Sequence, residues 1–199
     1  MTPDVVIRPY TDADERGWLE CRVLAFLDSA YYDADEREKE HYERPSVELV
    51  AETDGRIVGL IDLECEEEPG TVCREGPGLG AMIWHIAVLP EFRRHRIASR
   101  LLATAEVELR ARGIGRVEAW TRDDAWVQAW YESQGFEQVY SYLHVYVHGR
   151  GEVDGVITSE LPGLKPIKVF AQYTETEGRD DIRRRFERVH DCVCYERSF

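Results

Sequence analysis

The chain has 199 residues, of which 43% are hydrophobic and 11% aromatic, and its formal net charge is −14. This length suits one domain with a proper core, spanning residues 1–199. The acidic balance argues against general binding to nucleic acid, because phosphate repulsion would dominate. The sequence shows neither the roughly 18–20 consecutive apolar residues of a membrane span nor a secretory signal at its N-terminus. We therefore expect a cytoplasmic protein that binds neither nucleic acid nor membrane.

In the first half of the chain, apolar periodicity and turn residues predict one helix, a second charged helix and a hairpin. The expected elements are a strand at Val5–Ile7, a helix start at Thr11–Asp14, a helix from Glu15 to about Tyr32, a helix over Asp35–Tyr42, and strands Val47–Glu52 and Arg56–Cys65 around an Asp54-Gly55 turn. A loop rich in Gly, Pro and acidic residues follows at 66–80.

In the second half of the chain, the same patterns predict a strand–helix–strand unit followed by further strands. The expected elements are strand Met82–Val88, helix Ile97–Arg112, strand Val117–Thr121, helix Ala125–Ser133 and strand Gln138–His148. Parallel strands need a crossover helix, whereas the hairpin and the late strands imply antiparallel neighbours. We predict an α/β (α+β) fold with a mixed, mostly antiparallel central sheet and helices on both faces.

Residues 149–199 extend beyond the predicted core, which covers about 5–148. They contain a strand-like Ile167–Tyr173, a charged helix near Asp180–His190 and a strand-like Cys192–Tyr195. We expect this tail to complete the sheet and to shape either the substrate site or a dimer contact, so a homodimer is left open.

The five cysteines do not suggest a metal site or a disulfide framework. Their number is odd and they form no C-x-x-C pair: Cys21, Cys65, Cys73, Cys192 and Cys194. Reduced, mostly buried thiols are the simpler interpretation, and no metal is expected.

The most informative stretch is Ile86–Ser99, where a buried strand ends at Pro90, a basic turn follows and a long helix opens. Backbone N–H groups at a helix start are unpaired and carry partial positive charge, so they collect phosphate oxygens. The turn adds further positive charge through Arg93, Arg94, His95 and Arg96. This arrangement suits a polyanion such as the pyrophosphate and 3′-phosphate of coenzyme A. A helix with an incidentally basic entry is the structural alternative.

This stretch resembles the acetyl-CoA-binding motif of the GCN5-related N-acetyltransferase (GNAT) superfamily. A second match lies downstream, where Ala129–Phe136 (AWYESQGF) is similar to the family's A-x-[FY]-Y-E-[KS]-x-G-F. The two motifs cover about residues 82–140 in the expected order. The chain departs from the pattern at Arg96, where relatives usually carry glycine, and at Asp124, where many relatives carry a CoA-contacting Asn.

The resemblance implies an acetyl-CoA site and a direct transfer of the acetyl group to a primary amine, on a small molecule or a peptide, without an acyl-enzyme. It places the cofactor-binding residues at Ile86, Ala87, Val88, Arg93, Arg94, His95, Arg96, Ile97, Ala98 and Ser99. A backbone N–H near Ile86–Val88 would polarise the thioester carbonyl. Tyr131 stands at the position of the general acid, because a neutral phenol can protonate the leaving thiolate.

The general base is not fixed by the sequence. Positions that hold a base in some relatives are Met82 and Trp84 here, and neither side chain can accept a proton. Glu64, Glu118 and His85 are the candidates, and a chain of water molecules is another. Strand alternation places His85 on the face opposite Trp84 unless a bulge re-aims it.

Aromatic and basic residues are candidates for the acceptor pocket, although an aromatic stripe at helical spacing also suits a core. They are Trp18, Arg22, Phe26, Tyr31 and Tyr32 near the N-terminus, Trp84 on the predicted strand Met82–Val88, and Tyr140, Tyr142 and His144 from the late strands. The main alternative to an enzyme is a catalytically degenerate module that senses acyl-CoA or binds a protein. A purely structural acidic protein would bind no CoA, which fits the two motifs poorly.

Overall fold

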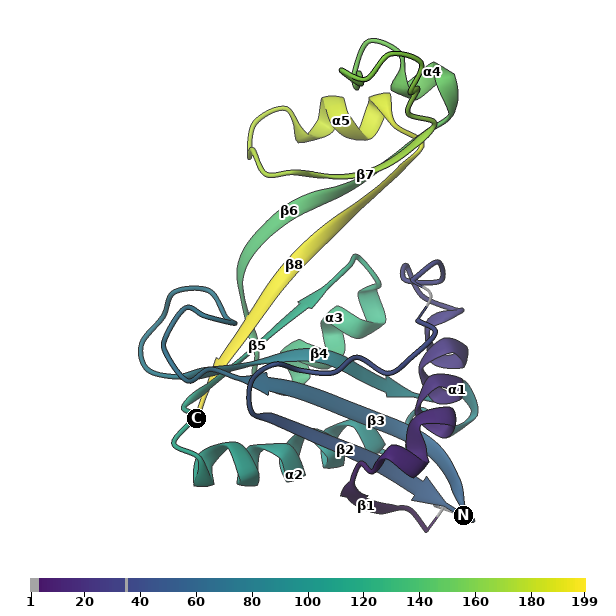
Figure 1. Cartoon of the computed structure of the whole chain (residues 1–199). Helices are drawn as coiled ribbons and strands as arrows, with labels where there is room; N and C mark the ends of the chain where they lie inside the picture. Colours follow the sequence, from purple (N-terminus) through teal and green to yellow (C-terminus); the bar gives the residue numbers. More distant parts are fainter. Residues whose placement is uncertain (1–3, 35) are drawn as a thin grey trace.

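Eight strands form one sheet in the order β1-β2-β3-β4-β5-β8-β6-β7 in the computed structural model, which describes residues 4–34 and 36–199 (Figure 1). The strands are β1 (Val6–Pro9), β2 (Ser46–Thr53), β3 (Arg56–Cys65), β4 (Gly80–Val88), β5 (Arg116–Thr121), β6 (Glu137–His148), β7 (Lys168–Tyr173) and β8 (Arg188–Ser198). Only β4 and β5 pair in parallel, and the other neighbours are antiparallel. The predicted mixed, mostly antiparallel sheet is confirmed.

Helices cover both faces of the sheet. The helices of the described residues are η1 (Asp12–Asp14), α1 (Glu15–Phe26), η2 (Pro90–Phe92), α2 (Ile97–Ala111), α3 (Ala125–Ser133), α4 (Gly149–Val153) and α5 (Arg179–Arg185). On one face, Trp18 of α1 meets the ring of His85 of β4 edge-on at 5.0 Å. On the other face α2 lies so close to β3 that a Cβ at Gly59 would be 2.9 Å from Ile97. That close approach explains why β3 carries glycine there.

Two predictions near the N-terminus are wrong. The helix expected to reach about Tyr32 ends at Phe26, because the N–H and the hydroxyl of Ser29 both donate to the Phe26 carbonyl. The helix expected over Asp35–Tyr42 is absent from its described residues, 36–42, which are irregular. These residues lack an apolar stripe that a helix could bury, and Lys39 is the one buried side chain among them.

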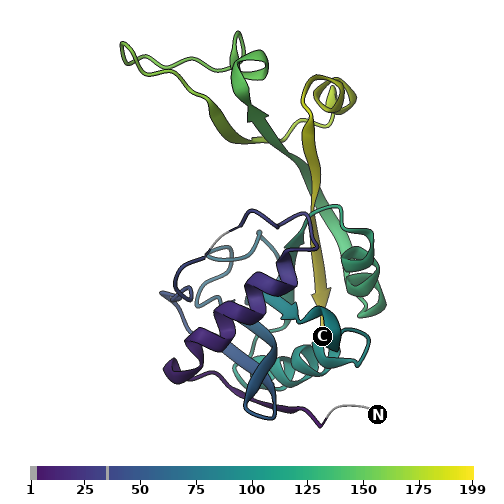
Figure 2. The same cartoon turned by 90° about the vertical axis from the view of Figure 1, so that its right-hand side faces the viewer.

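Residues 149–187 are an excursion between β6 and β8, whose outer halves carry it away from the body of the molecule (Figures 1 and 2). The predicted charged helix near Asp180–His190 is shorter, at Arg179–Arg185, and the last strand is longer than Cys192–Tyr195. We call residues 143–190 the arm. Five buried residues form its own small hydrophobic cluster, separate from the main core: Leu143, Val145, Val147, Val153 and Phe186.

Candidate functional site

The two central strands separate part-way along their length. β4 and β5 are paired from Gly80 to Ile83 and from Arg116 to Ala119. Beyond that point β4 runs on to Val88, paired only with β3 in the described part of the chain. One edge of residues 84–88 therefore offers backbone groups to an added extended chain, which is how a strand-like ligand binds a sheet.

A bulge lies at the start of this separated segment. Ile83 is opposite Leu63 and His85 is opposite Asp62, so Trp84 is the extra residue. Bulges re-aim side chains. The Trp84 side chain is 46% exposed, and its indole N–H donates to the Glu64 carboxylate at 3.0 Å. His85 points the other way from Ile86, toward Trp18 and α1.

At the mouth of the gap stands the start of α2. The loop before it contains two non-glycine residues with left-handed backbone, Arg94 (φ 65°) and Arg96 (φ 60°). Such a conformation strains a residue that has a Cβ, by roughly 1–2 kcal/mol. The Arg94 and Arg96 side chains are exposed, whereas Ile97 is buried in the core. The first helical turn, whose N–H groups have no partner within the helix, and two exposed arginines thus lie next to each other in the chain directly after β4.

Three of the other predicted cofactor-binding residues make contacts within the protein itself. The Arg93 guanidinium donates to the Ala25 carbonyl at 2.8 Å and lies over the Trp126 ring. A ring nitrogen of His95 lies 3.2 Å from the Phe92 carbonyl. The Ser99 hydroxyl accepts from the Trp130 indole at 3.4 Å, so it joins α2 to α3.

Asp124, the second departure from the family pattern, is not directed to the helix start of α2. Its carboxylate accepts from the backbone N–H of Ala30 at 2.9 Å. It therefore fixes the beginning of α3 against the turn that follows α1.

Tyr131 lies on α3, buried among aromatic rings. It stacks on Tyr195 with ring centroids 5.5 Å apart, and the rings of Trp130 and Phe136 meet it edge-on. Burial raises the pKa of the Tyr131 phenol above its ordinary value of about 10. The hydroxyl therefore keeps its proton throughout the neutral range.

Two of the base candidates flank Met82. Glu64 on β3 and Glu118 on β5 are both in register with it, which places their backbones roughly 10 Å apart. The Glu118 carboxylate accepts from the Arg74 backbone N–H at 2.9 Å and from the Trp120 indole at 2.8 Å. The Trp84 indole thus holds the Glu64 carboxylate, and the Trp120 indole holds that of Glu118.

His85 is engaged at both ring nitrogens. Its Nδ1 accepts from the Arg22 guanidinium at 3.2 Å, and its Nε2 lies 3.1 Å from the Glu40 carboxylate. A lone pair already occupied by a guanidinium proton cannot also accept the proton of a substrate. This geometry favours the two glutamates over His85.

The acceptor-pocket candidates divide into two groups. Trp18 and Arg22 are buried beneath the connection after α1, and Arg22 lies over the Phe26 ring. Tyr31 lies beneath the Arg122 guanidinium at 4.1 Å, and Tyr32 beneath that of Arg188 at 4.4 Å.

The late strands join this second group. The Arg122 guanidinium also donates to His144 Nδ1 at 3.2 Å, and His144 adjoins the Tyr142 ring. Trp120 lies 6.0 Å from Tyr140 and 5.2 Å from Tyr142, ring to ring. Sequence reasoning missed Trp120 and Arg122. Trp120 could have been found, because it lies two residues after Glu118 on one strand and so shares its face.

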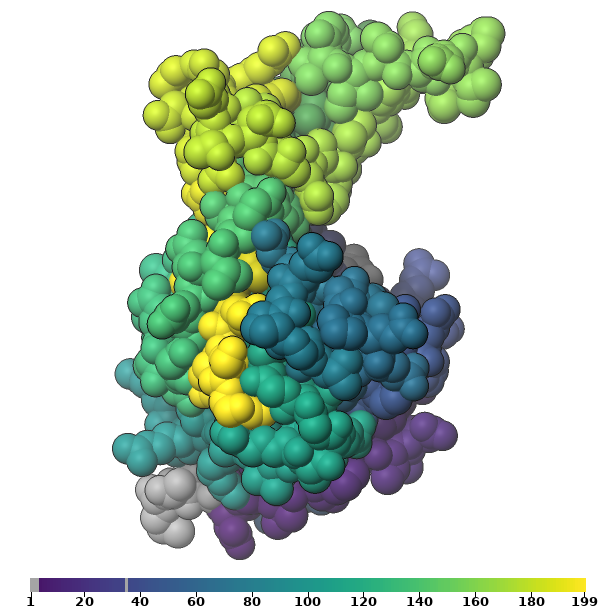
Figure 3. Space-filling model, turned by 90° about the vertical axis from the view of Figure 1, so that its left-hand side faces the viewer, coloured from purple at the N-terminus to yellow at the C-terminus, as the bar shows by residue number. Residues whose placement is uncertain are grey.

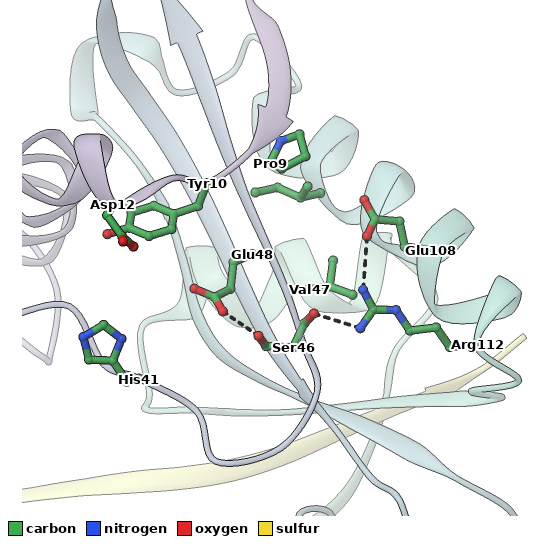
Figure 4. A pocket seen from close by; sticks show the side chains of 10 residues that line it. Pro9, Tyr10, Asp12, His41, Ser46, Val47, Glu48, Glu108 and Arg112 are labelled. Carbon is green, nitrogen blue, oxygen red and sulfur yellow. Dashed lines mark hydrogen bonds and ion pairs between the residues drawn. The ribbon is translucent and has the colours of Figure 1, made fainter.

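A pocket of about 340 Å³ lies elsewhere, between β2 and the C-terminal end of α2 (Figure 4). Its lining includes Tyr10, Ser46, Glu48, Glu108 and Arg112, and Arg112 donates to the Ser46 carbonyl. Because Glu108 and Arg112 end α2 and the separated strands face its beginning, this pocket is distinct from the candidate site. Among the described residues, no group of three or more His, Cys, Asp or Glu could hold a metal, and no helix is long and apolar enough to cross a membrane.

Residues 13–136 match the sequence profile of the Acetyltransferase (GNAT) family, and the chain belongs to this family. A mycothiol acetyltransferase of Brachybacterium faecium is 30% identical over 131 residues. That alignment covers 62% of this chain but only 38% of the relative.

Solved structures of low sequence identity share the fold. An acetyltransferase of the GNAT family from Streptococcus pneumoniae matches with a TM-score of 0.61 at 13% identity, over 98% of this chain and 100% of that one. The ribosomal-protein-S18-alanine N-acetyltransferase of Escherichia coli gives 0.57 at 16% identity, over 98% and 93%. A GNAT acetyltransferase from Elizabethkingia anophelis with acetyl-CoA bound gives 0.53 at 14% identity, over 98% and 99%.

Proposed function

We propose that this protein transfers the acetyl group of acetyl-CoA to a primary amine by direct attack, with both substrates bound together. One observation carries the proposal: β4 and β5 part beyond Ile83, beside the start of α2. An extended thiol arm fits the unpaired strand edge, and its phosphates fit the helix start.

The residues that would hold acetyl-CoA are the backbone of Ile86–Val88, the first turn of α2 at Ile97–Ser99, and the loop of residues 93–96. The exposed guanidinium groups of Arg94 and Arg96 supply positive charge for phosphate. Bound acetyl-CoA supplies an activated acetyl thioester. The unpaired edge of β4 supplies N–H groups that stabilise negative charge developing on its carbonyl oxygen.

Tyr131 is the proposed general acid. As the amine nitrogen bonds to the carbonyl carbon, the carbon–sulfur bond breaks and the Tyr131 hydroxyl gives its proton to sulfur. Its place on α3 supports this role, because the neighbouring Trp130 indole reaches the Ser99 hydroxyl in the first turn of α2.

Glu118 and Glu64 are the proposed bases for the proton that the amine loses. They flank Met82 on the two neighbouring strands, and their indole partners hold the carboxylates in place. The bases differ in surroundings: Glu118 is fully buried, whereas Glu64 lies beside the exposed Trp84. A cationic amine would meet carboxylate and indole groups here, which bind ammonium ions well.

The cysteines support direct transfer. All five are buried free thiols, and burial raises the pKa of each. A nucleophilic cysteine generally needs the opposite, a lowered pKa. Incubation with labelled acetyl-CoA alone should therefore leave no label on the protein, and double-reciprocal plots should intersect.

The first experiment is CoA binding followed by turnover. CoA should raise the melting temperature, because a ligand of the folded state stabilises it. Charge reversal at Arg94 and Arg96 together should weaken CoA binding, most strongly at low salt. Charge reversal at Arg110, near the other end of α2, is the matched control and should leave it unchanged. Equal affinity in both variants would contradict the phosphate assignment.

The acceptor is tested with a panel of small amines and N-terminal peptides. Relatives are named for both kinds of acceptor, mycothiol and a ribosomal protein. A second candidate function, acyl-CoA sensing without catalysis, is favoured by Arg96 in place of glycine and by Met82 between the two glutamates. CoA binding without turnover of any amine would support the sensor.

A further inference from the structure

Exposed apolar side chains gather on the arm. Five large ones lie within fifteen residues, and each is at least 39% exposed: Val156, Leu161, Leu164, Ile167 and Phe170. They lie on the excursion that projects from the body, apart from the main core (Figures 1 and 3). Large exposed apolar side chains gathered on one projecting segment are typical of an interaction site.

The charge of the arm differs from that of the rest of the chain. Residues 143–190 contain eight Lys or Arg and eight Asp or Glu, whereas the whole chain has a formal charge of −14. Two bodies of this protein repel each other, but two arms do not. The arm is therefore the part of the molecule where a second copy can approach without electrostatic penalty.

The arm also ends in an unpaired strand. β7 is the last strand of the sheet and pairs with β6 on one side only in the described part of the chain. Its exposed residues, Lys168, Phe170 and Gln172, alternate with partly buried ones. An exposed strand edge with apolar side chains is a template for pairing with another strand.

We propose that the arm is a self-association surface, on which β7 of a second copy pairs with β7 in antiparallel fashion about a twofold axis. An axis perpendicular to the sheet keeps the exposed faces together, so even-numbered residues lie opposite even-numbered ones. Two such registers lie equally near the centre of Lys168–Tyr173, and the one that places Phe170 opposite the partner's Phe170 brings the two exposed rings together. The eight-stranded sheet then continues into that of the partner.

The side chains of β7 suit this register. The Phe170 ring lies 4.6 Å from the His144 ring and 4.9 Å from the Tyr146 ring, centroid to centroid, yet half of its surface is exposed. Aromatic pairs directly opposite one another stabilise antiparallel strands. Lys168 lies opposite the partner's Gln172, so no like charges face each other. Val169 and the partner's Ala171 meet on the other face.

The first test is the mass in solution, by light scattering over a range of concentrations. Wild-type protein should reach twice 23.1 kDa. Phe170→Glu places two carboxylates at the axis and should return the mass to 23.1 kDa at the same concentration. Gln172→Glu is the matched control: the same charge on the same face, but opposite Lys168 of the partner, so the dimer should persist.

Three results would overturn the proposal: a monomeric wild type, a dimeric Phe170→Glu variant, or dissociation of both variants alike. A crosslinking test remains informative even where a charge on β7 disturbs the arm. Phe170→Cys brings two thiols opposite each other at about 4.5–5.5 Å between Cα atoms, a separation that a disulfide spans. The Phe170→Cys variant should crosslink under mild oxidation. The Gln172→Cys variant should not, because in this register residue 172 lies four residues along the strand from residue 172 of the partner, a separation of more than about 10 Å. Absence of a Phe170→Cys crosslink would also contradict the register.

Discussion

The ammonium group of Lys39 lies 3.0 Å from the Asp62 carboxylate, and both side chains are buried. Glu48 supplies a second carboxylate at 2.5 Å. The faces of three aromatic rings surround the same ammonium: Tyr10, Trp18 and Tyr42. Lys39 is the one buried residue in the described part of the connection between α1 and β2, residues 27–34 and 36–45. A cation, not an apolar side chain, therefore holds this connection on the sheet.

Lys39→Met should destabilise the fold by about 3–5 kcal/mol, because it leaves the Asp62 carboxylate buried and without its partner. Urea denaturation measures the change. Arg37→Met, at an exposed position of the same connection, should change stability by less than about 0.5 kcal/mol. Adding Asp62→Asn to Lys39→Met should recover most of the loss, and a single variant as stable as wild type would refute the ion pair's importance.

Tyr131→Phe should lower turnover by about 100-fold or more while leaving CoA binding and stability nearly unchanged, because only the proton donor is lost. The measurement is single-turnover acetylation of a confirmed acceptor. Tyr195→Phe is the control: that ring stacks on Tyr131, and its hydroxyl donates to Glu132 at 3.2 Å. Equal rates in the two variants would make Tyr131 structural.

Arg96→Gly should stabilise the fold by up to about 1 kcal/mol, since glycine adopts a φ of 60° without strain. Arg96→Ala keeps the strain and removes the charge. If the guanidinium contacts phosphate, both variants should weaken CoA binding to a similar degree. Thermal melts with and without CoA separate the two effects, and a melting temperature unchanged by glycine would argue against strain at this position.

The sequence correctly predicted those helices and strands that are defined by local signals, such as apolar periodicity and turn residues. Pro90 and Gly113 bound the α2 region, and the regular stripe of Leu101, Leu102 and Leu109 lies in the core as expected. The family motifs led correctly to the family and the sheet. The role of the motif residues in binding acetyl-CoA stays a prediction.

Long-range contacts decided the parts that the sequence did not reveal. The connection at 36–42 is irregular because Lys39 reaches Asp62 on β3, 23 residues away in sequence, as well as Glu48 on β2. The bulge at Trp84 depends on the register between two strands and has no local signature. Asp124 shows the same limit, since its partner is the backbone of Ala30, 94 residues away.

The two glutamates that flank Met82 should differ in their effect on catalysis. Replacement of the base by glutamine should lower turnover by about 10²–10⁴-fold, whereas replacement of the other glutamate should lower it by less than about 10-fold. Glu118→Gln and Glu64→Gln preserve the shape of each side chain. Pre-steady-state rates with a confirmed acceptor distinguish them. Rates near wild type in both variants would leave a water chain as the base.

His144 should make the fold sensitive to mild acid. Burial, together with Arg122 and His190, lowers the pKa of His144 to about 4, and its Nδ1 accepts from the Arg122 guanidinium only while unprotonated. In the unfolded chain the imidazole titrates near its ordinary value of about 6.5. The unfolded state therefore binds a proton that the folded state does not, and stability is lost as the pH falls from about 6.5 through 4.

His144→Gln keeps an acceptor for Arg122 but does not titrate. Between pH 7 and pH 4 its free energy of unfolding should fall by about 1–3 kcal/mol less than that of the wild type. His148→Gln, at an exposed position on the same strand, should follow the wild-type curve. Urea denaturation at several pH values gives the three curves, and the acidic groups common to all three cancel in the comparison. If the His144→Gln curve ran parallel to the wild type down to pH 4, the imidazole would have to accept its proton in the folded protein, which would place Arg122 away from Nδ1.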